Sequence, residues 1–156
     1  MEISVIMTDR NIQTTLVKFE DITNFQVRRT ADADQMNFYD FGFDFSELRY
    51  SGSQIKSPLF TLNRFSVMFV FFLKKEVTKL AILEAINQYN AETPLTKTEL
   101  MRFRGKKLEV NFSIDFINND EDITTNQLEA VVNIMSATPE DFGKHLLERK
   151  IAISQA

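Results

Sequence analysis

The sequence predicts an α+β fold, an antiparallel sheet of about five strands with helices packed on one face, in the order α-βββ-α-ββ-α-α. The predicted strands fall in two separate blocks, residues 22–73 and 99–117, and apolar and polar residues alternate with a period of two over 39–45 and 99–117. Helical periodicity separates and follows these blocks instead of alternating with single strands, which argues against a parallel sheet. The chain has 156 residues and neither a repeat nor a linker, so we expect a single domain over 1–156.

The composition is that of a folded protein without covalent cross-links. The chain is 44% hydrophobic and 26% charged, and it contains no cysteine for a disulfide, a thiolate metal site or a nucleophile. Its net charge of −4 argues against nucleic acid or an anionic membrane as the main partner. The longest apolar run, Phe65 to Leu73, is far shorter than the ~20 residues of a membrane-spanning helix. Because no signal peptide is visible either, we expect a cytoplasmic protein.

The first third of the chain predicts one helix and two strands. Apolar residues at helical spacing, after two suitable N-cap residues, predict a short helix over 8–20. Residues 22–30 predict the first strand. The second, 39–45 with a possible extension to residue 50, alternates four aromatic rings with two aspartates and a glycine. The Ser- and Gly-rich stretch 51–58 then predicts a turn region.

The third strand, Leu59 to Leu73, is apolar on both faces, as expected of a strand that is covered on both sides. We expect the helix that follows to cover the first face. The second face would be covered either by residues 1–20 or the C-terminal helix, or by a second subunit. The first face consists of Phe65, Val67, Phe69, Phe71 and Leu73. The second face, a candidate protein interface, consists of Met68, Val70 and Phe72.

The second half predicts a helix, a hairpin and two further helices. A broad apolar face predicts a helix over Val77 to Ala91. Period-two alternation over 99–117 predicts a hairpin, with Gly105 supplying the positive φ of its turn. A capping box that starts at Thr124 predicts the next helix, and a last helix is expected to start at Thr138, with a proline at its first position.

Four cations surround the expected hairpin turn and form a candidate anion contact. They support an alternative function, a nucleic-acid-binding or anti-host regulatory protein of a mobile element that uses the basic hairpin 102–107. The simpler interpretation is a charged turn in solvent. Phe103 is two residues from Met101, so both are expected to lie on the face of the strand that packs on the core, which leaves the cations without an aromatic partner. The four cations are Arg102, Arg104, Lys106 and Lys107.

The acidic loop 118–122 resembles the start of a calcium loop that ends on Glu129, but Ile123 stands where such a loop needs glycine. An acidic turn before a helix N-terminus explains the same residues. We therefore predict no metal site in this loop or elsewhere in the chain.

Other titratable residues do not form a catalytic motif. Asp40 and Asp44, with Glu47 beyond, could act as an acid/base pair or hold a divalent ion, but they also suit the wet face of a strand. The single histidine, His145, is expected near a helix C-terminus, where it interacts favourably with the helix dipole. The common nucleotide-binding, zinc-protease and hydrolase motifs are absent from the sequence. We therefore expect no catalytic residues, no cofactor and no enzyme activity.

The second half, over about residues 59–148, resembles the bacterial YbjN-like family. The resemblance is carried by Ala85 to Asn90, the hairpin from Leu100 to Phe116, the segment from Asp122 to Met135, and Phe142 to Leu147. Members of that family are described as sensory-transduction regulators and share the fold of type III secretion chaperones. The resemblance implies a type III secretion chaperone-like arrangement without catalytic residues. On this basis we expect a small protein-binding module, chaperone-like or a regulatory adaptor, that binds a client protein and forms a homodimer.

Overall fold

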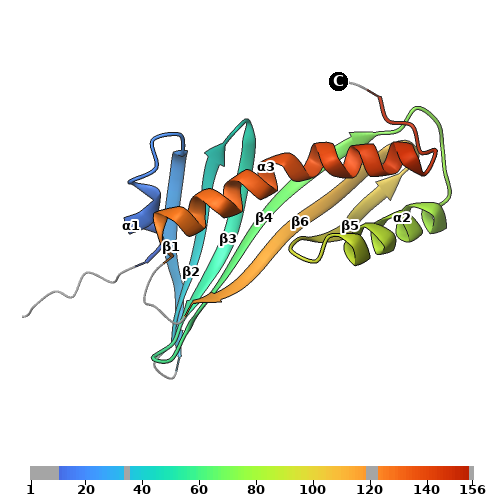
Figure 1. Ribbon diagram of the computed structural model, residues 1–156. Coiled ribbons are helices and arrows are strands. Elements are labelled where there is room, and N and C mark those ends of the chain that lie inside the picture. Colours follow the sequence, from blue (N-terminus) through green and yellow to red (C-terminus); the bar gives the residue numbers. More distant parts are fainter. Residues whose placement is uncertain (1–10, 34–35, 119–122, 155–156) are drawn as a thin grey trace, which may run out of the picture.

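The computed structural model describes residues 11–33, 36–118 and 123–154. These residues form one antiparallel sheet of six strands, in the spatial order β1-β2-β3-β4-β6-β5, and three helices (Figure 1). The chain order is α-ββββ-α-ββ-α. The elements are α1 (Gln13–Leu16), β1 (Thr23–Ala33), β2 (Met36–Phe45), β3 (Leu48–Lys56), β4 (Thr61–Phe72), α2 (Lys79–Glu92), β5 (Lys97–Arg104), β6 (Lys107–Asn118) and α3 (Thr125–Glu148).

The expected α+β class and the antiparallel sheet are confirmed, but the expected number of strands is wrong. The aromatic segment forms two strands, because the chain reverses at Ser46 and Glu47. Their φ angles of 51° and 64° are those of a tight hairpin turn that usually contains Asn or Gly. Because neither Asn nor Gly stands at these two positions, the sequence carries no turn signal there. The next strand, β3, therefore runs through most of the stretch 51–58, where we expected a turn region.

Gly52 lies inside β3 because its neighbours leave no room for a side chain. A Cβ atom there would lie 2.1 Å from the carbonyl oxygen of Arg64 and 2.4 Å from Cζ of Phe41. Gly52 pairs with Phe41 on one side and Phe65 on the other, and these two rings lie 5.0 Å apart, centroid to centroid. The glycine thus serves packing between strands and not a turn.

The two expected closing helices are one helix, α3, which passes through Pro139. We expected Thr138 to cap a new helix, but its Oγ1 donates to the carbonyl of Ile134, 2.8 Å away, within the same helix. The capping box at Thr124 is confirmed. One buried stripe continues through the proline without a change of phase, so both halves pack on the same sheet and a break would lose that packing. The stripe repeats every seven residues as Leu128, Met135 and Phe142, and as Val132, Pro139 and Leu146.

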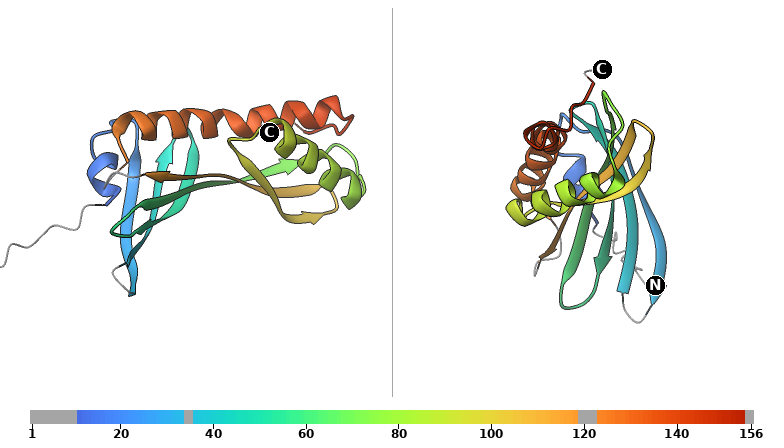
Figure 2. Two further views of the ribbon diagram at one scale, coloured as in Figure 1. Left: turned by 60° about the horizontal axis from the view of Figure 1, so that its bottom comes forward. Right: turned by 90° about the vertical axis from the view of Figure 1, so that its right-hand side faces the viewer.

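All three helices lie on one face of the sheet, as expected (Figure 2). The core is divided into two clusters along α3. One cluster lies between α1, the first half of α3 and strands β2 to β4, and the other between α2, the second half of α3 and strands β4 to β6. Helix α3 joins the two clusters and leaves the opposite face of the sheet without a helix among the described residues.

The remaining elements lie close to their expected positions. Helix α2 begins after Thr78, whose Oγ1 accepts from the amide of Ala81 at 3.1 Å. Gly105 has a φ of 58°, as the hairpin turn requires. Helix α1 is shorter than the helix expected over 8–20, and residues 8–10 of that prediction lie outside the described part of the chain. None of the described helices combines the length and apolar character needed to cross a membrane.

Candidate functional site

The open face of β4, on the side of the sheet away from the helices, carries three exposed apolar residues. Met68 is 56% exposed, Val70 36% and Phe72 51%. We call these three residues the apolar row. The assignment of residues to the two faces of β4 is therefore confirmed for the apolar row.

The described part of the chain provides no cover for the apolar row. Helix α1 lies on the other side of the sheet, where the amide of Ile12 donates to Oε1 of Gln54, a buried residue of β3. Helix α3 packs against the same covered face. Neither residues 11–20 nor the C-terminal helix covers the row, and residues 1–10 lie outside the described part.

Cations of the β5–β6 hairpin lie on the same sheet face as the apolar row. Phe72 pairs with Lys107 on β6, and Lys107 pairs in turn with Arg104 on β5. Because paired residues point to the same face, these side chains form one line across three strands. The two candidate sites that the sequence suggested separately thus meet in space.

The neighbouring row of paired residues across the same three strands contains a glutamate. Val70 pairs with Glu109, which pairs with Arg102. The carboxylate of Glu109 lies 3.3 Å from the ammonium of Lys107. The face therefore alternates apolar, cationic and acidic side chains and is not uniformly basic.

A bulge in β5 adds another exposed apolar side chain. The register shifts between Leu100 and Arg102, which leaves Met101 unpaired and 51% exposed. Phe103 packs against the second core cluster, as expected. Met101 was expected on the same face as Phe103 but is exposed instead. The extra residue of the bulge shifts by one position the alternation of side chains between the two faces.

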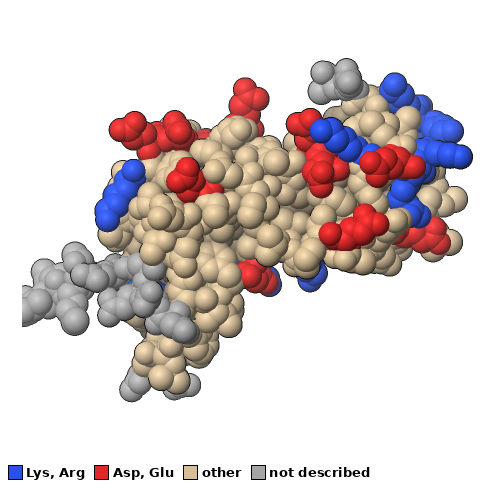
Figure 3. Space-filling model, viewed as in Figure 1, with Lys and Arg blue, Asp and Glu red and all other residues tan. Residues whose placement is uncertain are grey.

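The end of β4 also meets the C-terminus of the described chain and the hairpin turn. The amide of Leu73 donates to the carbonyl of Lys106 at 2.7 Å, and that of Lys74 to the carbonyl of Ala152 at 2.9 Å. Figure 3, which views the helix-covered side, shows Lys and Arg side chains, with Asp and Glu among them, at this end of the molecule, where β4 and α3 end. We call its exposed cations the basic end. It consists of Lys74, Lys75, Lys79, Arg104, Lys106, Lys107 and Lys150.

The chain is acidic overall but strongly asymmetric in charge. Segments 73–79, 102–109 and 144–150 contain ten of the eighteen Lys and Arg residues and three of the 22 Asp and Glu residues. Sequence reasoning found only the middle segment, because the three come together solely through the fold. The remainder of the chain carries the excess negative charge.

The aspartates considered as an acid/base pair are engaged by cations. Asp40 lies 3.8 Å from a guanidinium nitrogen of Arg28. Asp44 accepts from Asn24 at 2.7 Å and from Arg49 at 3.1 Å. These hydrogen bonds, that of Asn24 first, lower the pKa of Asp44 below its ordinary value. The two carboxylates each serve a local pair. A pocket of about 340 Å³ beside them is lined by Asp40 and by Arg28 and Arg49, but not by Asp44, so it does not bring the two carboxylates together.

His145 fastens the two longer helices together. It is 7% exposed, and its Nε2 lies 2.9 Å from the carbonyl oxygen of Ala85 in α2. Because a carbonyl can only accept, Nε2 is the protonated nitrogen. Its ring also lies 5.3 Å from that of Tyr89, centroid to centroid. These contacts give the histidine a structural role in α2–α3 packing.

The acidic loop considered for calcium lies outside the described residues from 119 to 122. Asn118, which is described, is buried, and its side-chain amide donates to Oε1 of Gln127 at 3.3 Å. The same Oε1 accepts from the amide of Thr124 at 2.9 Å, in the capping box. The side chain of Asn118 is thus occupied by the start of α3.

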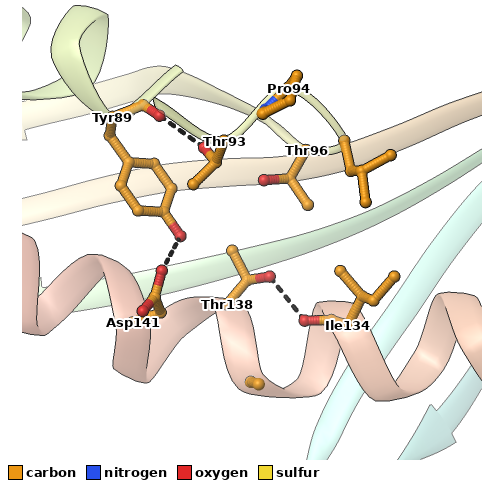
Figure 4. Close-up of a pocket in the computed structure, with 9 residues that line it drawn as sticks. Tyr89, Thr93, Pro94, Thr96, Ile134, Thr138 and Asp141 are labelled. Atoms are coloured by element: carbon orange, nitrogen blue, oxygen red, sulfur yellow. Dashed lines mark hydrogen bonds between the residues drawn. The ribbon is translucent and has the colours of Figure 1, made fainter. Parts of the chain in front are cut away.

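A pocket of about 420 Å³ lies between the α2–β5 turn and the middle of α3 (Figure 4). At one side the hydroxyl of Tyr89 donates to Oδ2 of Asp141 at 2.8 Å. Burial, followed by this bond, raises the pKa of Tyr89 well above its ordinary value. Sequence reasoning missed the pocket because its lining comes from two segments remote in sequence, 89–96 and 134–141. The lining residues are Tyr89, Thr93, Pro94, Leu95, Thr96, Ile134, Ala137, Thr138 and Asp141.

Comparison of the chain with family models, curated proteins and solved structures finds no match. The class of protein therefore follows from the fold and the surface alone: an open-sheet α+β protein with an apolar row beside a basic end. The resemblance to the YbjN-like family stays a prediction.

Proposed function

We propose that this protein is a small, non-catalytic bacterial module that binds other polypeptides through the open face of its sheet, as a chaperone-like or regulatory adaptor. The observation that carries the proposal is the exposure of the apolar row on a central strand whose other face buries Phe65, Val67, Phe71 and Leu73 to 5% exposure or less. Exposed apolar groups that lie together on a folded surface typically mark sites of association. The resemblance to the YbjN-like family, with its type III secretion chaperone-like fold, supports the same function.

The apolar row supplies part of the free energy of association, and polar contacts must supply the rest, because association costs at least about 4 kcal/mol in lost freedom of motion. Complete burial of a Val, Met or Phe side chain contributes about 1.5–3 kcal/mol. Since the three residues are roughly half exposed, covering them would add roughly 1 kcal/mol each. A partner that covers the row thus gains about 3 kcal/mol before any polar contact is counted.

Partner capture with matched variants tests the proposal. Phe72→Asp places a charge in the row, while Leu147→Asp does the same at an equally exposed site on α3, since both residues are 51% exposed. Proteins from a bacterial extract that bind the wild type and Leu147→Asp, but not Phe72→Asp, support the proposed surface. Equal binding by all three chains contradicts it.

The expected homodimer is one form that such binding could take, and it stays a prediction. Light scattering at tens of micromolar measures it directly. A dimer mass that Phe72→Asp reduces to that of a monomer supports self-association through the row. A monomer mass for the wild type contradicts the homodimer and leaves binding to other proteins.

The alternative, binding of nucleic acid, gains one observation from the structure. The backbone carbonyls of Lys106, in the hairpin turn, and of Ala152, two residues after Lys150, accept from the amides of Leu73 and Lys74 at the end of β4. Salt-dependent binding of an oligonucleotide would favour this function if charge reversal at the hairpin abolished it. The residues to reverse are Arg102, Arg104, Lys106 and Lys107.

A further inference from the structure

We infer that the polypeptide bound by the open face is an acidic, amphipathic segment of another protein. Its apolar side chains would lie on Met68, Val70 and Phe72, and its carboxylates would face the basic end. This inference rests on the proposed function and adds the chemistry of the partner.

The first argument is the continuity of the two surfaces. Phe72 ends the apolar row and pairs with Lys107, a member of the basic end. Alternate residues of a strand lie about 7 Å apart, so the row extends about 14 Å from Met68 to Phe72. Residues four apart on a helix lie about 6 Å from one another, so a helical segment could place successive apolar side chains along the row.

The second argument is that other cations on the open face already have partners within the chain. Arg64 makes two hydrogen bonds to Asp115, at 2.7 and 2.8 Å. Arg28 pairs with Asp40 at 3.8 Å. The positive charge of this part of the face is thus neutralised internally.

The basic end differs from that part of the face. Its Arg104 and Lys107 lie on the open face in line with Phe72, and its other cations adjoin that face at the end of β4. Lys107 has a carboxylate partner in Glu109. In contrast, no carboxylate of the described residues forms an ion pair with Arg104, Lys106, Lys74, Lys75 or Lys150. Within the described residues these cations have no carboxylate partner, so their attraction for anions is available to the carboxylates of a bound polypeptide.

The third argument concerns the kind of partner. Within the apolar row only Phe72 is aromatic, so the row offers a single platform for stacking a base, whereas Met68 and Val70 suit aliphatic contacts. Glu109 lies within the face and opposes a continuous line of phosphates. A two-fold axis parallel to β4 would bring the two basic ends of a dimer close together, which like charges disfavour, so this arrangement of a homodimer is opposed. An acidic amphipathic polypeptide meets none of these obstacles.

A random peptide library displayed on phage tests the inference with the full chain as bait. Peptides are selected on the wild type and counter-selected on Phe72→Asp. We expect enrichment of sequences that combine apolar residues with Asp and Glu. Enrichment of basic or uncharged apolar peptides would overturn the inference while leaving the proposed function intact. Failure to enrich any peptide that requires Phe72 would contradict both.

Fluorescence anisotropy of one enriched peptide then measures the charge contribution. Arg104→Glu should weaken binding about tenfold, and increasing salt should weaken it further. Lys18→Glu provides the control. Lys18 is exposed, as Arg104 is, but it follows α1 at the opposite end of the molecule. Equal affinities of the wild type and Arg104→Glu would overturn the inference.

Two other polyanions are measured in the same assay, a single-stranded oligonucleotide and vesicles that contain phosphatidylglycerol. We expect both to bind at least about tenfold more weakly than the peptide at physiological salt. Tighter binding of either one, dependent on Arg104, would replace the acidic polypeptide by nucleic acid or by an anionic membrane.

Discussion

The covered face of β4 buries Phe65, Val67 and Phe71 to 5% exposure or less, whereas Met68 and Phe72 on its open face stay more than half exposed. The two faces differ little in the hydrophobicity of their residues. They differ in what lies above them, since α2 and α3 both pack on one side of the sheet. A strand's hydrophobicity therefore indicates that a face can be buried, but the helices decide which face the chain itself buries.

Polar side chains on the covered and open faces of the sheet also differ in how they are paired. On the covered face, Nε2 of buried Gln54 donates to Oδ1 of buried Asn63 at 2.9 Å, while Nδ2 of Asn63 has no partner among the described residues. On the open face, polar side chains form exposed ion pairs, such as Arg64 with Asp115, at much lower cost in desolvation. Substitutions on the covered face should therefore change stability, and substitutions on the open face should change binding.

Phe65→Ala should have the largest effect on folding. Phe65 is fully buried, and its ring lies 5.0 Å from that of Phe41 and 6.0 Å from that of Phe116, centroid to centroid. Removing it should lower the free energy of unfolding by about 3–5 kcal/mol, as measured by urea denaturation. Phe72→Ala on the open face is the matched control and should cost less than about 1 kcal/mol. Similar losses for both would show that the two faces are not distinct.

Gly52→Ala should have the next largest effect, because it adds volume where the covered face has none to spare. The new Cβ would press against backbone of β4 and the ring of Phe41. We expect a loss of about 1–3 kcal/mol or more in the free energy of unfolding. Ser51→Ala, an exposed neighbour, should change it by less than about 0.5 kcal/mol. A neutral Gly52→Ala would contradict the packing described for β3.

Tyr50→Phe should have a moderate effect that depends on pH. It removes the hydrogen bond from the Tyr50 hydroxyl to the carbonyl of Val132, 3.1 Å long, at a cost of about 0.5–1.5 kcal/mol near neutral pH. Burial raises the pKa of Tyr50 above its ordinary value of 10.0. The folded state therefore holds the phenol proton more tightly than the unfolded state does, and stability decreases as the pH rises above about 10. Denaturation at several alkaline pH values should show a smaller decrease for Tyr50→Phe than for the wild type.

Asp115→Asn should have the smallest effect on folding. The hydrogen bond from Arg64 holds the pKa of Asp115 below its ordinary value of 3.8. The pair therefore stabilises the fold above that pH and loses its contribution as the pH falls below it. Because both side chains are exposed, we expect a loss of at most about 1 kcal/mol at pH 7 and no difference from the wild type at strongly acidic pH. A difference that persists in acid would mean that another contact of Asp115 matters.

Prediction from the sequence succeeded where local patterns decide the structure. The hairpin around Gly105, the helix after Thr78 and the faces of the apolar row all follow from the periodicity of neighbouring residues. It failed at Ser46 and Glu47, where the turn lacks the usual residues, and at Pro139, where packing on the sheet keeps one helix continuous. The seven-residue repeat across Pro139 was a usable signal, because a chain break between helices would normally reset the phase.

The candidate site was predictable only in part. Period-two alternation identified the apolar row and the hairpin cations as separate features, since each lies within one segment. The line that joins Phe72 to Lys107 and Arg104 depends on the pairing of β4 with β6. Met101 joined the exposed face through a bulge, which changes parity without a clear sequence signal.

The sequence by itself determined that β4 has two apolar faces, because alternation along a strand assigns side chains to faces from local geometry alone. Only the tertiary structure decided that both long helices lie on the same side and leave Met68, Val70 and Phe72 uncovered. It also decided that three basic segments, remote in sequence, meet at the end of this strand. The physical reason is that helix docking and strand order depend on contacts between distant residues, and such contacts leave no period in the sequence.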